Sequence, residues 1–441
     1  MAYKKSFFTI ISIIIFSNLF LFIPLFGSAV DGKTVLSEQA EITLLTSSPG
    51  EELYSIFGHS ALRVVDPEKN IDLAYNYGTF DFDTPNFYLK FGRGQLMYKL
   101  SVGSYRNYEY IYRREGRAVY EQVLDLNQQE KQRVYDFLTE NALPENRYYR
   151  YDFFYDNCAT RIRDLIDDLL VVEWFEDPYE VKPRTFRELL APFLEHTPWN
   201  KFGTDIALGM PSDITASAYE YMFLPDEMYI GFASARMADG SPLVSEYRTL
   251  VEESLVRQKP DLFNPLLVCW LVFIAGLLSF LKPTAEKVFD MVFFSILCVN
   301  GIIIMFLWFA SEHTATNNNM NLLWSLPTHI YFFFNFHFRQ INRFSRWYFK
   351  IIMLLMLFFV VFWPWMPQGL NPAFFPVILL VLIKSVPPAL NIDIAGKLKR
   401  RVVSMYTKRI TACKSLKVQT GNQQKEFCSL YIIQRNCVKN Y

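Results

Sequence analysis

The apolar positions divide the chain into two parts with different patterns. From Val30 to about Pro260, short apolar runs alternate with charged residues, as in a domain that has a polar surface and a buried core. From Asn264 to about Leu390, long apolar runs are separated by short loops, at about 264–281, 288–309, 322–338, 348–363 and 372–390. At about 1.5 Å per helical residue, each run covers most of a ~30 Å hydrocarbon core. The pattern predicts a water-exposed domain followed by five transmembrane helices.

The start of the chain predicts export of the domain that follows it. Lys4 and Lys5 precede an apolar stretch at 7–26, which ends in small residues at 27–29. These are the parts of a secretory signal peptide, and an uncleaved N-terminal anchor is the alternative. We therefore expect a signal peptide or anchor (1–29), an exported domain (30–260), a five-helix transmembrane domain (261–390) and a cytoplasmic tail (391–441).

The charges of the loops indicate the orientation in the membrane. Lys and Arg residues gather at 282–287, 339–350 and 397–401, whereas the loops at 311–321 and 364–371 contain neither. Basic loops face the cytoplasm, so five spans place the exported domain outside and the tail inside. Four spans would leave one of the basic groups on the outer side.

Charge and cysteine content narrow the chemistry. The 44 Lys and Arg residues balance 44 Asp and Glu residues, which gives no electrostatic basis for a nucleic-acid partner. Of six cysteines, only Cys158 lies in the exported domain, so this domain has no internal disulfide. An unpaired thiol in an oxidising compartment needs a task or deep burial. The sequence has no paired Cys or His motif typical of a metal site and no phosphate loop, so neither a metal nor a cofactor is predicted.

The residues around Cys158 predict the start of an amphipathic helix. Apolar side chains recur at helical spacing after it, at positions 162, 165, 166, 169 and 170, and either Asp156 or Asn157 is a suitable N-cap. A thiol in the first turn meets unpaired N–H groups and the positive end of the helix dipole, which favour the thiolate. The same N–H groups could stabilise an oxyanion. The alternative is a small buried apolar residue.

A base for this thiol must come from another segment, and the exported domain has two histidines. His59 follows Gly58 at the start of a predicted strand, 59–65, with a second strand predicted at 71–77. A short helical turn is expected before it, at 51–57. His196 lies in a predicted surface loop and has no expected role. For His59 alone, a structural histidine is the alternative to a base.

Two segments and the membrane block together resemble a known family. The run Phe57 to Arg63 reads Phe-Gly-His-Ser-Ala-Leu-Arg, and Asp156 to Asp164 reads Asp-Asn-Cys-Ala-Thr-Arg-Ile-Arg-Asp. A strand-borne His before a helix-opening Asn-Cys resembles the permuted papain-like (NlpC-type, lecithin–retinol acyltransferase-like) fold. With the outer loop 311–327, the chain from about Glu41 to Leu390 looks like the Lnb-type lipoprotein N-acyltransferases of Bacteroidota. This resemblance implies an α+β permuted papain-like exported domain followed by an all-α five-helix transmembrane domain.

The resemblance also implies roles for individual residues. Cys158 would be the nucleophile, His59 the base, and a polar residue on the next strand would orient the imidazole. We expect Asn76 there, with Tyr77 and Asp81 as alternatives, because the His that some relatives carry at this place is absent. Further candidates for substrate contacts are Arg63, Arg161, Glu312, His313 and Asn321. Structural ion pairs are the alternative for the two arginines, and His313 is an alternative base.

The implied function is the transfer of an acyl chain from a membrane phospholipid, through a Cys thioester, to the α-amine of the lipid-modified N-terminal Cys of a diacylated lipoprotein. The implied location is the bacterial inner (cytoplasmic) membrane, as a multi-pass protein with its catalytic domain in the periplasm. A membrane-anchored cysteine peptidase or amidase acting on peptidoglycan peptides is the main alternative. A non-enzymatic sensor or transport partner is a second one.

Overall fold

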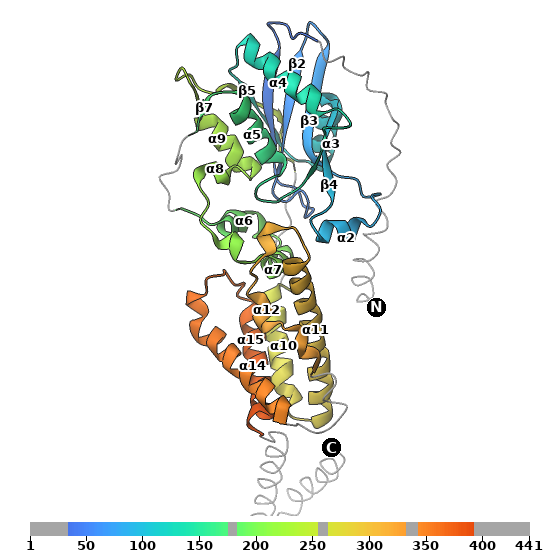
Figure 1. Cartoon of the computed structure of the whole chain (residues 1–441), viewed down its shortest axis with the longest axis vertical. Coiled ribbons are helices and arrows are strands. Elements are labelled where there is room, and N and C mark those ends of the chain that lie inside the picture. Colours follow the sequence, from blue (N-terminus) through green and yellow to red (C-terminus); the bar gives the residue numbers. More distant parts are fainter. Residues whose placement is uncertain (1–33, 175–182, 255–262, 332–342, 392–441) are drawn as a thin grey trace, which may run out of the picture.

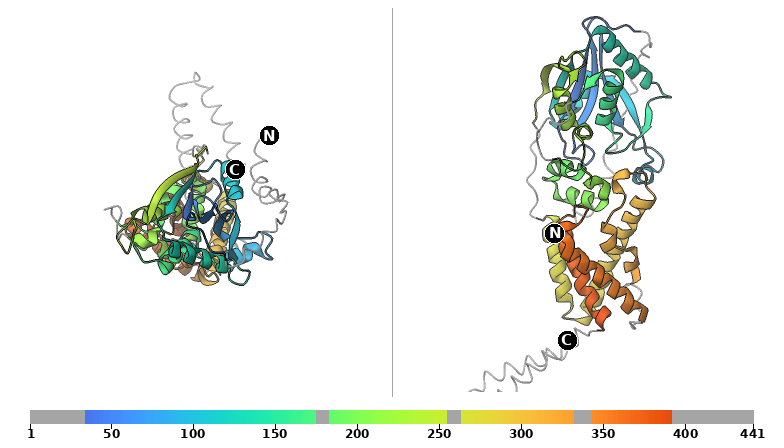
Figure 2. Two further views of the ribbon diagram at one scale, coloured as in Figure 1. Left: turned by 90° about the horizontal axis from the view of Figure 1, so that it is seen from above. Right: turned by 60° about the vertical axis from the view of Figure 1, so that its left-hand side comes forward.

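The computed structural model describes residues 34–174, 183–254, 263–331 and 343–391. A domain built around a β-sheet stands on a bundle of helices, and the helices of the bundle run away from the sheet along the long axis (Figures 1 and 2). The expected signal peptide or anchor and almost all of the expected tail lie outside the described residues.

A seven-stranded antiparallel sheet forms the centre of the first domain. Its spatial order is β6-β4-β3-β2-β1-β5-β9. The strands are β1 (Glu41–Ser47), β2 (His59–Asp66), β3 (Ile71–Thr79), β4 (Met97–Ser104), β5 (Val119–Leu124), β6 (Tyr148–Arg150) and β9 (Val244–Val251). A short hairpin pairs β7 (Val172–Glu173) with β8 (Arg236–Met237). The strands predicted at 59–65 and 71–77 are thus confirmed to within two residues.

Helices cover both faces of this sheet. Alternate residues of β2 point to opposite faces: Leu62 and Val64 join the core under α4 and α5, whereas Ala61 packs toward α3. The helices of this domain are α2 (Phe87–Gly92), α3 (Tyr105–Glu115), α4 (Gln128–Asn141), α5 (Cys158–Leu169), α6 (Phe186–Leu194), α7 (Pro198–Ala207), α8 (Ala218–Tyr221) and α9 (Pro225–Ser234). Residues 51–57 form turns instead of the expected helical turn, and Gly58, with a φ of 81°, ends the segment just before β2.

The second domain consists of apolar helices. They are α10 (Pro265–Ser279), α11 (Pro283–Phe309), α14 (Arg343–Phe362) and α15 (Phe374–Leu390), with the short α12 (Asn321–Trp324) and a 3₁₀ turn at Pro327–His329. By length and composition, Pro283–Phe309 and Arg343–Trp365 are each able to cross a membrane. The third predicted span, 322–338, begins with these short turns and continues outside the described residues. Five transmembrane helices therefore stay a prediction.

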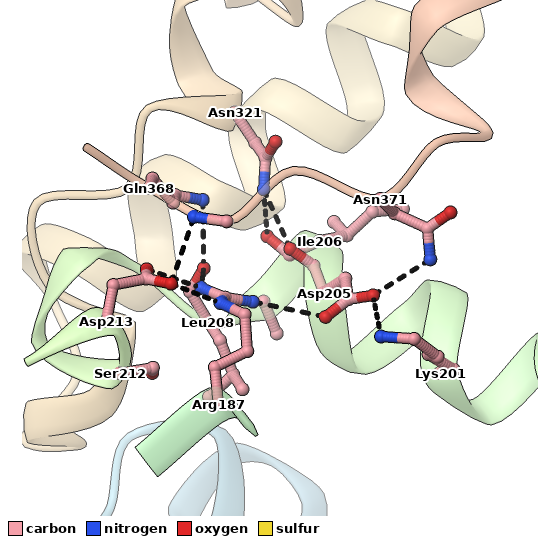
Figure 3. A network of polar contacts seen from close by, with 12 residues as sticks. Arg187, Lys201, Asp205, Ile206, Leu208, Ser212, Asp213, Asn321, Gln368 and Asn371 are labelled. Carbon is pink, nitrogen blue, oxygen red and sulfur yellow. Dashed lines mark hydrogen bonds and ion pairs between the residues drawn. The ribbon is translucent and has the colours of Figure 1, made fainter. Parts of the chain in front are cut away.

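A polar network joins the two domains (Figure 3). Arg187 of α6 forms ion pairs with Asp205 of α7 and with Asp213. From the membrane domain, Asn321 donates its side-chain N–H to the carbonyl oxygen of Asp205, and Asn371 donates to the Asp205 carboxylate at 2.8 Å. Since Asp205 is buried, these contacts fix the sheet domain on the helices.

Candidate active site

Cys158 is the first residue of α5, as the sequence predicts. Asn157 is the N-cap, and its side-chain oxygen accepts hydrogen bonds from the N–H groups of Ala159 and Thr160. The Asn157 amide in turn donates to the carbonyl oxygens of Phe153 and Phe223. The helix start, and with it the sulfur, is therefore held from both sides.

His59 opens β2 and lies beside Cys158. Its Nε2 and the side-chain oxygen of Asn76, on β3, are 2.5 Å apart. With Nε2 donating to Asn76, Nδ1 is the ring nitrogen left to serve the thiol. Cys158 and His59 both lie beside Gly78, and each shifts the pKa of the other. The structure thus brings together the three residues for which the sequence predicts a catalytic role.

Gly78 makes this meeting possible. It has a φ of 83° and lies where the pairing of β3 with β4 shifts register between Asn76 and Thr79. A Cβ at this position would lie 3.3 Å from Cβ of Cys158 and 3.9 Å from Cε1 of His59. Only glycine combines this backbone conformation with the space that the two side chains need.

The electrostatics favour an ion pair between the two reactive groups. Burial alone raises the pKa of the Cys158 thiol, but His59 and the backbone N–H groups of Ser60 and Ala159 lower it below its ordinary value. Burial alone lowers the pKa of His59, whereas Tyr112, Cys158 and Asn76 raise it to about 10. The lowered pKa of the thiol and the raised pKa of the imidazole both mean that the charged forms, thiolate and imidazolium, are favoured.

The pair lies in a pocket of about 440 Å³ with mostly aromatic walls. That volume is in the range of small-molecule sites, roughly 300–1,000 Å³. Besides His59, Asn157, Cys158 and two glycines, the lining consists of Leu53, Tyr54, Phe57, Phe80, Phe82, Phe87, Tyr88, Phe91, Tyr98, Tyr151, Phe153, Phe223, Leu224 and Pro225. A thiolate–imidazolium pair facing an apolar cavity can attack a carbonyl carbon attached to an apolar group.

The two predicted arginines lie outside this pocket lining. Arg63 forms ion pairs with Asp72 and Glu121 and lies 3.6 Å from the centre of the Tyr105 ring. Arg161 pairs with Asp156 through two hydrogen bonds and lies over Tyr149. Their guanidinium groups are thus occupied by structural partners, which was the alternative interpretation.

The rivals to Asn76 are placed elsewhere. The Tyr77 side chain points to the opposite face of β3, where its hydroxyl donates to Asn141. Asp81 lies in the exposed turn after β3 and accepts the N–H of Asp83.

The outer-loop residues contact the sheet domain without lining the pocket. Glu312 accepts hydrogen bonds from Gln95 and Arg150. His313 Nε2 lies 2.8 Å from the carbonyl oxygen of Phe91, which is itself in the pocket wall. Asn321 is fully buried at the domain junction. His313 therefore supports the pocket from outside, whereas His59 is the histidine that lines the pocket together with Cys158.

Three features of the site differ from, or go beyond, the expectation from sequence. The N–H groups at the helix start were expected to be available to an oxyanion, but those of Ala159 and Thr160 donate to the side chain of the Asn157 cap. The need for glycine at position 78 follows from a register shift between strands, which short sequence patterns do not reveal. The density of Phe and Tyr between positions 80 and 98 was the available signal for the aromatic wall.

Comparison with known protein families agrees with the two-domain division. The model of the Lnb N-terminal periplasmic domain matches residues 31–191, which include His59, Asn76 and Cys158. The model of the Lnb transmembrane domain matches residues 257–392. No match was found among curated proteins or solved structures. The two Lnb domains follow one another along the chain, and the matched ranges include the Cys158 site and the apolar helices. This chain therefore belongs to the Lnb family of lipoprotein-modifying membrane enzymes, with a periplasmic domain and a membrane domain.

Proposed function

We propose that this protein is a thiol-dependent N-acyltransferase, which moves an acyl chain from a membrane phospholipid to the α-amine of the lipid-modified N-terminal Cys of diacylated lipoproteins. The observation that carries this proposal is the position of Cys158 and of the Asn76-bound His59 in an aromatic pocket whose wall contacts the outer loop of the membrane domain. The fold that we propose for the periplasmic domain is the permuted papain-like one.

In the first half-reaction, His59 holds the proton of the Cys158 thiol, and the thiolate attacks the ester carbonyl carbon of a phospholipid. The N–H of Cys158, at the positive end of α5, stabilises the oxyanion. The next two N–H groups, those of Ala159 and Thr160, donate to the side chain of the Asn157 cap instead. The ester C–O bond breaks, the lysophospholipid oxygen takes the proton from His59, and an acyl thioester remains on Cys158.

In the second half-reaction, the lipoprotein amine attacks the thioester carbonyl carbon. The C–S bond breaks, the amine proton passes to the Cys158–His59 pair, and a stable amide forms. Both substrates are anchored in the outer leaflet of one bilayer, which raises their effective concentration at the site. We therefore propose a multi-pass location in the bacterial inner membrane.

Mass spectrometry of the full-length protein in vesicles of phosphatidylethanolamine and phosphatidylglycerol tests the proposal. We expect a single acyl group on Cys158 that hydroxylamine removes. Addition of a diacylated lipopeptide with a free α-amine should discharge this adduct and leave an amide-linked chain on the peptide. Cys158→Ala should carry no adduct, whereas Cys269→Ala, which removes a buried thiol of α10, should behave as the wild type.

A different result would favour the peptidase. If the protein never carries an acyl group but cleaves soluble peptidoglycan peptides, and Cys158→Ala abolishes that cleavage, the acyltransferase proposal is wrong. The mostly aromatic pocket supports the lipid substrate, since it offers few polar groups to a peptide backbone.

A further inference from the structure

Large apolar side chains are exposed around the mouth of the Cys158 pocket. They come from the turn before β2, the segment after β3, and α2, and we call them the pocket rim. The rim consists of Leu53, Tyr54, Phe82, Tyr88, Leu89 and Phe91, each at least 50% exposed. All but Leu89 also line the pocket. A contiguous apolar surface beside an active site indicates a binding surface, because soluble surfaces seldom expose one.

The α2 part of the rim lies at the end of the apolar helix α11. A Cβ on Gly92, the last residue of α2, would lie 3.4 Å from the Phe306 ring of α11. Just after α2, Gly94 lies against the backbone of Glu312 and His313, and His313 contacts the carbonyl oxygen of Phe91. Figure 1 shows α2 on the side of the sheet domain nearest the upper end of α11.

The apolar surface continues from that helix to the rim. On α11, exposed apolar side chains recur along its length up to its last residue, Phe309, which is 69% exposed. A helix long enough to cross the membrane contacts lipid along such a surface. Because α2 packs against the same end of α11, the apolar rim begins where the lipid-facing surface of α11 ends.

We propose that the pocket rim rests in the outer leaflet and is the route by which a phospholipid acyl chain moves sideways from the bilayer to Cys158. The inference rests on the proposed function and adds the route of the acyl donor. Apolar side chains of a short amphipathic segment bind at the membrane boundary, where their transfer from water to lipid is favourable. A chain that follows them never crosses water on its way to the sulfur.

Photo-crosslinking tests the position of the rim without relying on activity. A benzoylphenylalanine at position 89, in full-length protein in vesicles of phosphatidylethanolamine and phosphatidylglycerol, should form a covalent adduct with phospholipid. The matched control is position 35, because Val35 is 68% exposed and the next residue, Leu36, donates its N–H to Gln132 of α4. Figure 1 shows α4 toward the end of the sheet domain that lies away from the helix bundle. We expect at least about tenfold more lipid adduct at 89. Equal yields, or crosslinks at 89 only to protein, would overturn the proposal.

An acylation assay tests the route. Leu89→Asp places a charge on the rim, and we expect the ratio of Cys158 acylation from vesicle phospholipid to acylation from a water-soluble short-chain ester to fall about tenfold. Val35→Asp should leave this ratio unchanged. An unchanged ratio in Leu89→Asp would overturn the route. If the wild type carries no adduct from phospholipid at all, the proposed function fails, and the crosslinking result still decides whether the rim contacts lipid.

Discussion

Gly78 lies directly against Cys158, and the place that a side chain would take at position 78 is only 3.3 Å from Cβ of the cysteine. The same place is 3.9 Å from Cε1 of His59. Cys158 and His59 thus leave little space for a side chain at position 78 of β3, a residue with no chemical role of its own.

Gly78→Ala should therefore impair acylation more than it impairs folding. Left-handed backbone costs a residue with a side chain about 1–3 kcal/mol, and the new methyl group would displace Cys158 or His59. We expect Cys158 acylation to fall about tenfold or more, because a displacement of about 1 Å at reacting atoms can cost roughly 100-fold in rate. Acyl adduct formation and thermal unfolding are the two measurements.

Two other glycines provide matched controls for this variant. Gly240 has nearly the same φ, 84°, with open space around it, so Gly240→Ala should show the backbone cost without loss of acylation. Gly103 on β4 has open space and no such φ, and Gly103→Ala should show neither effect. Equal acylation in Gly78→Ala and Gly240→Ala would contradict the close contact.

Asn76→Ala should slow acylation by about 10- to 100-fold. Asn76 accepts the hydrogen bond from Nε2 of His59, and a hydrogen bond to a charged group contributes about 1.5–3 kcal/mol. Asn76→Asp keeps an acceptor at this place, so it should recover part of the rate. Asn76 acts through His59, so Asn76→Ala should also change the pH profile of acylation. Loss of a residue with a purely structural role would lower the rate without changing that profile.

Alkylation of Cys158 should remain fast below the pH range of an ordinary thiol. The pKa of Cys158 is lowered by His59, so the reactive thiolate persists as the pH falls until that lowered pKa is reached. The His59 pKa of about 10 keeps the imidazolium partner protonated over the same range. In His59→Ala, the N–H groups of Ser60 and Ala159 are left to oppose the effect of burial, so the pKa of Cys158 and the midpoint of alkylation should move to higher pH. Peptide mapping after iodoacetamide treatment measures alkylation of Cys158 separately from that of the other cysteines. If the pH midpoint of Cys158 alkylation is the same in His59→Ala as in the wild type, the pairing of the two residues is refuted.

Arg187→Met should destabilise the junction between the two domains. Arg187 is the cation between Asp205 and Asp213, and its side chain is largely buried. Removing one partner of a buried ion pair costs about 3–5 kcal/mol. Arg113→Met is the control, since Arg113 is an exposed partner of Glu109 and such pairs contribute about 0–1 kcal/mol. Thermal unfolding of both variants in detergent should separate them clearly, and similar midpoints would contradict a fixed junction.

The local elements followed from the sequence because neighbouring residues determine them. Asn157 caps α5 through N–H groups two and three residues away, and the apolar spacing after Cys158 continues to position 170, so one local segment was enough to place Cys158 in the first turn. The start of β2 at His59 likewise followed from Gly58 and the apolar run after it. The apolar runs predicted α10, α11, α14 and α15 for the same reason, although the third run begins with short turns.

The tertiary structure alone decided which of these residues meet. The register shift near Gly78 and the packing of α5 against β2 and β3 bring His59 and Asn76 to Cys158. The tertiary structure also brings Glu121 of β5 to Arg63, and it places α2 against the end of α11. Such distances depend on how strands twist and where helices pack, and many weak contacts far apart in sequence determine both. A sequence pattern can therefore name the reactive residues, but only the packed chain sets the distance between them.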